Sequence, residues 1–376
     1  MKRIVQTIFI CLMLVFAVTE HAAAQDVQSA LQEARSSLDT DSLVSALPRE
    51  ARESLGNITP ENSGDLLEGL QQIYERGRSE IAGRFKQAAS SGLAVIAAVL
   101  FCSLATNLNG FSKIEISEQA ICAAGALAVT GLAVGNIHSV LSQCRNAIAD
   151  IGLFSRALLP VMAGAGALNG APTSALVRNT ITIFFSDLFI TAVNTVIMPL
   201  LYAYIAILTA NAVLANDMLR RIGDFIKWGS SMAAKIFLTV FIAYIGVSGA
   251  ISGTADSVAL KSAKLAISGA VPVVGGVISD ATEAVLVGAG IIKNAVGMYG
   301  LLGVCAICFL PFVTIGLHYI CFKAAAALAS SVCNAKLMNL IDGIGSCFGI
   351  ALGMLFSCAL LLFTSLILAI LAAGGA

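Results

Sequence analysis

The sequence predicts an all-α membrane protein that crosses the bilayer several times. Hydrophobic residues make up 58% of the 376-residue chain and charged residues only 12%, whereas about 25% of the residues in an ordinary globular protein are charged. Apolar runs of about 20 residues, the length that spans a bilayer as a helix, recur along the chain. Lipid is therefore the expected solvent for much of its surface.

The N-terminus is typical of a secretory signal peptide. Lys2 and Arg3 precede an apolar run from 4 to 18, and three alanines at 22–24 supply the small residues that a signal peptidase needs. We therefore expect residues 1–24 to be cleaved. The alternative is an uncleaved first transmembrane helix.

Residues 25–88 are expected to form a small helical region outside the cytoplasm. Eleven acidic and seven basic residues lie between 25 and 91, and this acidic segment directly follows the signal peptide. Leu66, Leu70 and Ile73 follow helical spacing. A segment this short has little core of its own, so we expect it to pack on a partner or on the membrane surface.

Residues 89–376 are expected to form the transmembrane domain, with about six full crossings and one or two partial ones. The candidate spans are 88–107, 120–141, 157–175, 180–214, 236–252, 298–322 and 345–371. The run 180–214 is too long for one straight crossing and contains Pro199, which predicts a broken or tilted helix, or two helices. Four basic residues against two aspartates place 217–235 in the cytoplasm by the positive-inside rule.

Four prolines suggest an internal duplication. They form two pairs, each with a spacing of 39 residues and offset from the other pair by 112: Pro160 with Pro199, and Pro272 with Pro311. Flanking residues align without gaps, which predicts a repeat of 157–252 in 269–364. Chance similarity between apolar segments is the alternative.

A helix break inside apolar sequence is the most informative feature for function. Pro272 and the pair Gly275 and Gly276 disfavour a continuous helix. Asp280 is well placed to cap a new helix that starts at 281, with Glu283 in the capping-box position. A helix that begins in the membrane leaves free amide groups, which are tolerated only against protein or a water-filled cavity.

Lys293 and Asn294 follow in the same segment and complete the predicted site. Ionisable groups inside a membrane are costly and are usually paired or functional. Glu283 and Lys293 are ten residues apart, nearly three helical turns, so they cannot pair within one helix. The plainer interpretation is that Asp280 and Glu283 only cap a helix at the membrane interface.

Signals of catalysis, cofactor binding and nucleic-acid binding are absent from the sequence. No nucleophile–base arrangement surrounds the carboxylates, and there is neither a P-loop nor an H-E-x-x-H motif. Cys305 and Cys308 form a lone C-x-x-C, whereas zinc sites need about four ligands. The basic density that nucleic-acid binding needs is missing. We expect no enzyme activity, cofactor or metal.

Two blocks closely resemble the signature of the stage III sporulation protein AE family. They are 270–281, AVPVVGGVISDA, and 292–297, IKNAVG. The layout of signal peptide, outer helical region and multi-pass body agrees over essentially the whole chain. The family assigns no catalytic residues, so the resemblance implies none here.

The resemblance also implies a biological setting. It implies a spore-forming firmicute and a membrane component, permease-like in the family, of the channel-like complex that joins mother cell and forespore. That complex resembles specialised secretion systems, and its other membrane subunits would be the partners. The protein would lie in the mother-cell membrane that faces the forespore. A stand-alone secondary transporter is the alternative, suggested by the repeat and the broken helices.

Overall fold

The computed structural model describes most of the chain after residue 39 as helix. The described residues are 40–60, 63, 66–109, 117–168, 172–214, 216, 218–233, 235–237, 239–241, 243 and 275–371. Within these ranges the structure contains helices and turns and no strand, which confirms the predicted all-α fold. The predicted signal peptide, 1–24, lies outside the described residues.

Two short helices come first. They are α2 (Thr40–Ala46) and α3 (Arg49–Leu55). Pro48 separates them, because proline disfavours helical geometry in the residue before it but suits the start of a helix. Gly56 ends α3 with a φ of 60°, a left-handed conformation that glycine adopts without strain.

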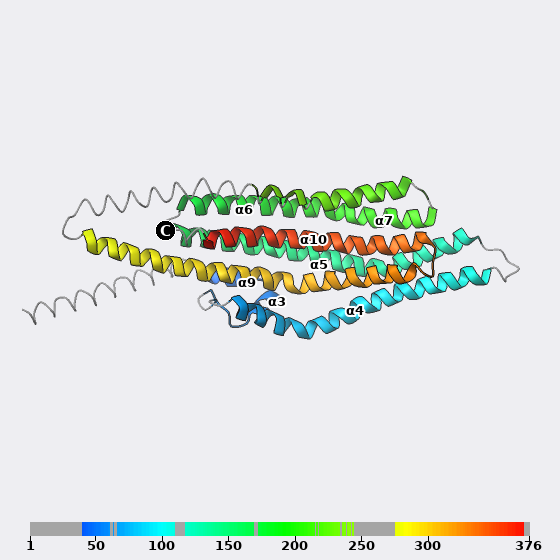
Figure 1. Cartoon of the computed structure of the whole chain (residues 1–376), viewed down its shortest axis with the longest axis horizontal. Coiled ribbons are helices and arrows are strands. Elements are labelled where there is room, and N and C mark those ends of the chain that lie inside the picture. The colour runs from blue at the N-terminus through cyan, green and yellow to red at the C-terminus, as the bar shows by residue number, and fades with distance from the viewer. Residues whose placement is uncertain are drawn as a thin grey trace, which may run out of the picture.

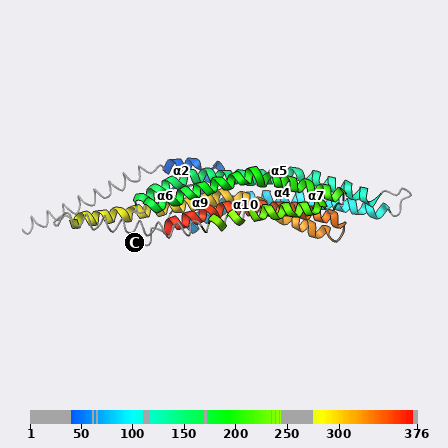
Figure 2. The same ribbon diagram turned by 90° about the horizontal axis from the view of Figure 1, so that it is seen from above.

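Long helices make up the rest of the bundle. They are α4 (Leu66–Asn109), α5 (Glu118–Leu168), α9 (Gly275–Ala329) and α10 (Ala335–Leu371), together with α6 (Pro172–Ala192), the π-helix η1 (Val193–Ile197) and α7 (Met198–Leu214). Figure 1 shows them lying side by side along one axis, and Figure 2 shows that the bundle is thin and gently bowed. With 55 residues, α9 is about 82 Å long at 1.5 Å per residue.

Five helical stretches among the described residues are long and apolar enough to cross a membrane, so the protein is a multi-pass membrane protein. They are Leu66–Leu108, Glu118–Ala165, Thr180–Leu214, Lys293–Ala329 and Ala335–Ile367. The prediction of separate spans at 120–141 and 157–175 is wrong, because the first and residues 157–168 of the second lie in the single helix α5, and residues 172–175 belong to α6. The polar residues between them belong to this helix and not to a connecting loop. The predicted span 236–252 lies largely outside the described residues.

The predicted boundary between the outer region and the transmembrane domain lies within a helix. Helix α4 continues through residues 88 and 89 without interruption. Its first half is polar and its second half is apolar, so the change in composition that suggested the boundary is a change along one helix. The assignment of 25–88 to the outside stays a prediction.

The hairpin of α9 and α10 forms the centre of the bundle. The most apolar windows of these two helices are 56% and 61% buried, against 28–33% in the other three stretches. Helices α4 and α5 pack against α9, while α6 and α7 pack against α5 and α10. The outer helices therefore shield the central hairpin, and most of their own apolar surface faces outward.

The prolines of the predicted repeat lie in long helices where they are described. Pro160 lies in α5 and Pro311 in α9, and Pro199 is the second residue of α7, which begins directly after η1. The widened π-helical turn before Pro199 leaves room for a proline ring that would clash in a regular α-helix, so the expected break in 180–214 is a π turn. Pro272 lies outside the described residues, and the repeat stays a prediction.

Candidate functional site

The predicted helix break differs from the helix that the structure contains. Helix α9 begins at Gly275, six residues before the predicted start at 281, and it continues past Met298 to Ala329. Asp280 therefore lies in the second turn and is not the N-cap, so that part of the prediction is wrong. Residues beyond 298 pack against α4, α5 and α10, and such packing outweighs local start and stop signals.

The other residues of the predicted break fall partly outside the described residues. Pro272 does so entirely, and Gly276 and Glu283 are described only as part of the backbone of α9. Lys293 is buried, with 1% of its surface exposed, whereas its neighbour Asn294 is exposed. These two residues therefore face in different directions. Their role at a polar cavity stays a prediction.

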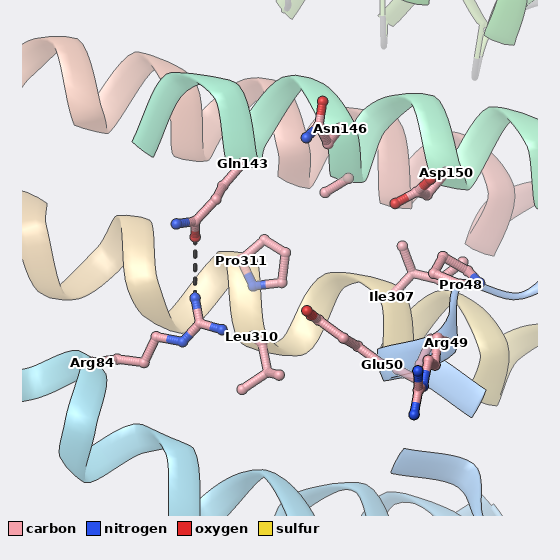
Figure 3. Close-up of a pocket in the computed structure, with 13 residues that line it drawn as sticks. Pro48, Arg49, Glu50, Arg84, Gln143, Asn146, Asp150, Ile307, Leu310 and Pro311 are labelled. Atoms are coloured by element: carbon pink, nitrogen blue, oxygen red, sulfur yellow. Dashed lines mark hydrogen bonds between the residues drawn. The ribbon is translucent and has the colours of Figure 1, made fainter. Parts of the chain in front are cut away.

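A polar pocket lies elsewhere in the bundle, between α3, α4, α5 and α9 (Figure 3). Its volume is about 490 Å³. The lining residues are Pro48, Arg49, Glu50, Ala51, Arg84, Gln143, Asn146, Ala147, Asp150, Ala306, Ile307, Leu310 and Pro311. Charged and amide side chains thus meet between helices that otherwise pack largely through apolar side chains, which makes this pocket the candidate functional site.

Helix α5 contributes three polar side chains to one wall of the pocket. Gln143, Asn146 and Asp150 are spaced by three and four residues, which places them on one face of a helix. Their neighbours Cys144 and Ile148 are buried in the apolar core on the other face. The helical period alone therefore turns amides and a carboxylate toward the pocket.

Arg84 of α4 joins three helices at the end of the pocket. Its Nη1 donates to Gln143 Oε1 of α5 and to Thr314 Oγ1 of α9, each at 3.3 Å. Its Nη2 donates to Glu80 Oε2 at 3.2 Å, and only 23% of the side chain is exposed. Hydrogen bonds to a guanidinium group fix geometry well, because its donors lie in one rigid plane.

Pro311 interrupts the helical hydrogen bonding of the opposite wall. Proline has no N–H group, so it cannot donate to the carbonyl of Ile307, four residues earlier. Both residues line the pocket. The wall formed by α9 is thus apolar in its side chains and lies where the regular α-helical hydrogen bonding is interrupted.

Polar side chains continue along α9 from this pocket toward the α9–α10 turn. The Nδ1 of His318 donates to the carbonyl of Thr314 at 2.9 Å, so in the neutral ring Nε2 is an acceptor. His318 is 1% exposed, and among the described residues Nε2 has no hydrogen-bond partner. Further along, the Nζ of Lys323 lies 2.7 Å from Asp342 Oδ1 and 2.9 Å from Ser346 Oγ. Ionisable groups within apolar spans are candidates for function.

No metal site emerges from the part of the chain that the structure describes. No group of three or more His, Cys, Asp or Glu side chains there could hold a metal ion. Cys305 and Cys308 are free thiols, each only partly exposed. The described residues can therefore act through hydrogen bonds and charge.

The pocket was not predicted from the sequence, although one signal was present. The spacing of Gln143, Asn146 and Asp150 within an otherwise apolar stretch indicates a polar stripe on a helix. The other contributors are distant in sequence, since Arg84 and Thr314 are 230 residues apart. Neither residue type nor local pattern reveals such a contact.

Comparison with known proteins extends over most of the chain. Residues 58–374 match the family model of stage III sporulation protein AE. The stage III sporulation protein AE of Bacillus subtilis (strain 168) is 22% identical over 354 residues, which cover 91% of this chain and 88% of that protein. No solved structure matches.

The family match includes every helix that carries the polar pocket except α3, and it includes both blocks that suggested the resemblance. The sequence prediction of the family is confirmed by a match of this length. The chain belongs to the stage III sporulation protein AE family.

Proposed function

We propose that this protein is a non-catalytic membrane subunit of the channel-like complex that joins mother cell and forespore during endospore formation. Its location would be the mother-cell membrane that faces the forespore, and its partners the other membrane subunits of that complex. Family membership supports a role in sporulation. The length of the apolar helices supports a role as a subunit.

The helices of the central hairpin are longer than the hydrocarbon core of a bilayer. The stretch Ala335–Ile367 has 33 residues, which corresponds to about 50 Å of helix, and it carries Lys336 and Asp342 near the turn. A bilayer has a hydrocarbon core of about 30 Å, so the whole stretch would fit inside it only at a tilt of more than about 50°, whereas transmembrane helices tilt by 0–40°. Part of the hairpin therefore extends beyond the hydrocarbon region.

Exposed apolar side chains occur at both ends of this hairpin. Leu328, beside the turn, is 60% exposed, and Ile367, near the far end of α10, is 46% exposed. Exposed apolar side chains beyond the hydrocarbon region gain free energy when another protein covers them. Neighbouring subunits of a complex would provide that cover, which is the observation that carries the proposal.

Gene deletion in the natural host tests the proposed process. We expect normal vegetative growth and a loss of heat-resistant spores of several orders of magnitude, restored by the wild-type gene. Equal spore counts in deletion strain and parent would refute the role in sporulation.

The state of the protein in sporulating cells tests the role as a subunit. A functional tagged protein, extracted in mild detergent, should migrate on native gels well above the size of one chain. The same protein expressed alone in vegetative cells is the control and should migrate at a smaller size. A single-chain species in cells that sporulate normally would contradict the proposal.

A stand-alone secondary transporter is the second candidate, and the polar pocket favours it. Small-solute sites in transporters lie between helices near the middle of the bundle, as this pocket does. A transporter would act alone. Migration as a single chain together with a need for the pocket residues would therefore favour transport over the complex.

A further inference from the structure

We propose that α2 and α3 form a proton-sensitive lid over the polar pocket, and that the carboxyl groups of Glu50 and Asp150 set its closure. This inference concerns the opening of the pocket and goes beyond the proposed role in a complex. It depends on the place of α3, on the contacts that hold it, and on two carboxylates that face each other.

Helix α3 closes one side of the pocket. Pro48, Arg49, Glu50 and Ala51 supply that wall, while α4, α5 and α9 supply the others. In Figure 3 the side chain of Glu50 extends into the pocket, and Arg49 extends away from it. Movement of α3 away from the bundle would open the pocket on this side without disturbing the long helices.

Apolar contacts hold the lid on the bundle. The side chains that anchor it are spaced by four residues and are at most 2% exposed: Leu43, Leu47, Ala51 and Leu55. Leu47 approaches Gly303 of α9 closely, where an added side-chain carbon would lie 3.4 Å from it. Burial of these groups favours the closed position.

Hydrogen bonds make α2 and α3 move together. The Nη2 of Arg52 in α3 donates to the carbonyls of Ser45 and Leu47, at 3.1 and 3.2 Å, at the end of α2. A bond from Arg76 of α4 to the carbonyl of Glu53 ties α3 to the neighbouring long helix. Helices α2 and α3 are thus one unit that contacts the bundle mainly through its buried apolar side chains.

One interaction opposes closure. Glu50 of α3 and Asp150 of α5 line the pocket from opposite walls, and the charge of Glu50 acts unfavourably on an ionised Asp150. Among the described residues neither carboxylate takes part in an ion pair. Arg84, the cation on the pocket wall formed by α4, is already bonded to Glu80.

The other charged groups around the lid do not relieve this repulsion. Arg49 pairs with Glu53 at 2.9 Å on the exposed side of α3. The pocket residues of α9 are all uncharged: Ala306, Ile307, Leu310 and Pro311. The remaining charged residues with described side chains on these elements do not line the pocket: Asp41 of α2, Arg52 of α3, Glu68, Glu75, Arg76, Arg78 and Lys86 of α4, Glu118, Arg145 and Arg156 of α5, and Lys293 and Lys323 of α9.

Protonation of one carboxyl group removes the repulsion. A proton taken up from water converts one carboxylate into a carboxyl group, whose O–H can donate to the remaining carboxylate. Acidic conditions therefore favour the closed lid, and loss of that proton to water at higher pH favours opening. Because Glu50 is exposed and Asp150 only half-buried, we expect a change of about two- to fivefold in the opening equilibrium.

Hydrogen–deuterium exchange of the purified full-length protein in detergent tests the lid. The amides of residues 43–55 are followed at pH 5 and pH 8 in wild type, Glu50→Gln and Asp150→Asn. We expect exchange to be about two- to fivefold slower in both variants than in wild type at pH 8, and the difference to be smaller at pH 5. Comparison at one pH cancels the intrinsic pH dependence of exchange.

Glu53→Gln is the matched control, because it makes the same charge change on α3 outside the pocket. It should exchange like wild type at pH 8. Glu50→Lys should slow exchange at both pH values, since it places a cation opposite Asp150. The proposal is overturned if Glu50→Gln and Asp150→Asn exchange like wild type at pH 8, or if Glu53→Gln slows exchange as much as they do.

Discussion

The ammonium group of Lys323 lies 2.7 Å from the carboxylate of Asp342, across the two arms of the central α9–α10 hairpin. Lys323 lies six residues before the end of α9 and Asp342 seven residues after the start of α10, so the pair joins the arms about 10 Å from the turn. Lys323 also donates to Ser346. The hairpin thus has a polar tie between two strongly apolar helices.

Exchange of the two charges should show that this pair stabilises the hairpin. Lys323→Asp or Asp342→Lys alone places two like charges together, and we expect lower protein levels and few spores. The double variant restores opposite charges and should recover most of both. Immunoblots and heat-resistant spore counts measure the two effects. A double variant no better than the worse single variant would show that the pair is not the reason for the loss.

Arg84→Ala should destabilise the bundle by about 1–3 kcal/mol, because it removes the hydrogen bonds that join α4 to α5 and α9. Arg84→Lys should recover only part of this, since an ammonium group cannot reproduce the planar arrangement of donors. Thermal unfolding in detergent measures the change.

Arg78→Ala is the control for this prediction. Arg78 is 69% exposed and lies 3.8 Å from Glu75, so its loss should have almost no effect. Equal shifts for both alanine variants would contradict the role of Arg84.

The thiol of Cys333, in the α9–α10 turn, should report the topology of the protein. This turn lies at the same end of the bundle as the C-terminus of α7 (Figure 1), where the positive-inside rule places the cytoplasm. In a variant that retains only this cysteine, an impermeant maleimide should label opened membranes and leave intact spheroplasts unlabelled. Labelling of intact spheroplasts would invert the topology.

The same thiol should react slowly at neutral pH. Burial raises the pKa of the Cys333 thiol above its usual value, and the thiolate is the reactive form. Its alkylation rate in opened membranes should therefore be lower at pH 7 than that of an exposed thiol and should continue to rise above pH 9. A rate that levels off at lower pH than for a free cysteine would show that the thiol is not shielded as described.

Substitutions at Asp280 test whether its charge has a function. Because α9 begins at Gly275, loss of a capping oxygen no longer distinguishes alanine from asparagine or serine. We expect Asp280→Ala, Asp280→Asn and Asp280→Ser to lower spore counts alike, with unchanged protein levels, since each removes a charge from an apolar helix. Wild-type spore counts in all three would show that this segment is not functionally important.

The all-α membrane fold could be predicted from the sequence, because an apolar run is recognised from consecutive residues alone. The runs 88–107, 298–322 and 345–371 fall within α4, α9 and α10. The continuity of α5 could not be predicted, because Arg145 and Asp150 resemble loop residues in a membrane protein. In the structure they occupy a helix whose other face is buried against the core.

Only part of the candidate site could be predicted from the sequence, for a similar reason. The polar stripe of α5 can be recognised from its spacing, but its partners come from helices far apart in the chain. Conversely, the glycines and the carboxylates near Asp280 suggested a helix start that the structure places earlier. Local capping signals were outweighed there by the packing of a long helix.

The continuity of α9 has a mechanical consequence. Thr314, bonded to Arg84 beside the pocket, and Lys323, bonded to Asp342, lie nine residues apart on one helix, which is two and a half turns, or about 14 Å. A helix is stiff over that length, so a rotation that draws Thr314 away from Arg84 also turns Lys323 relative to α10. The pocket contact and the hairpin tie therefore move together, and a bend at Pro311, which precedes both, would shift the two at once.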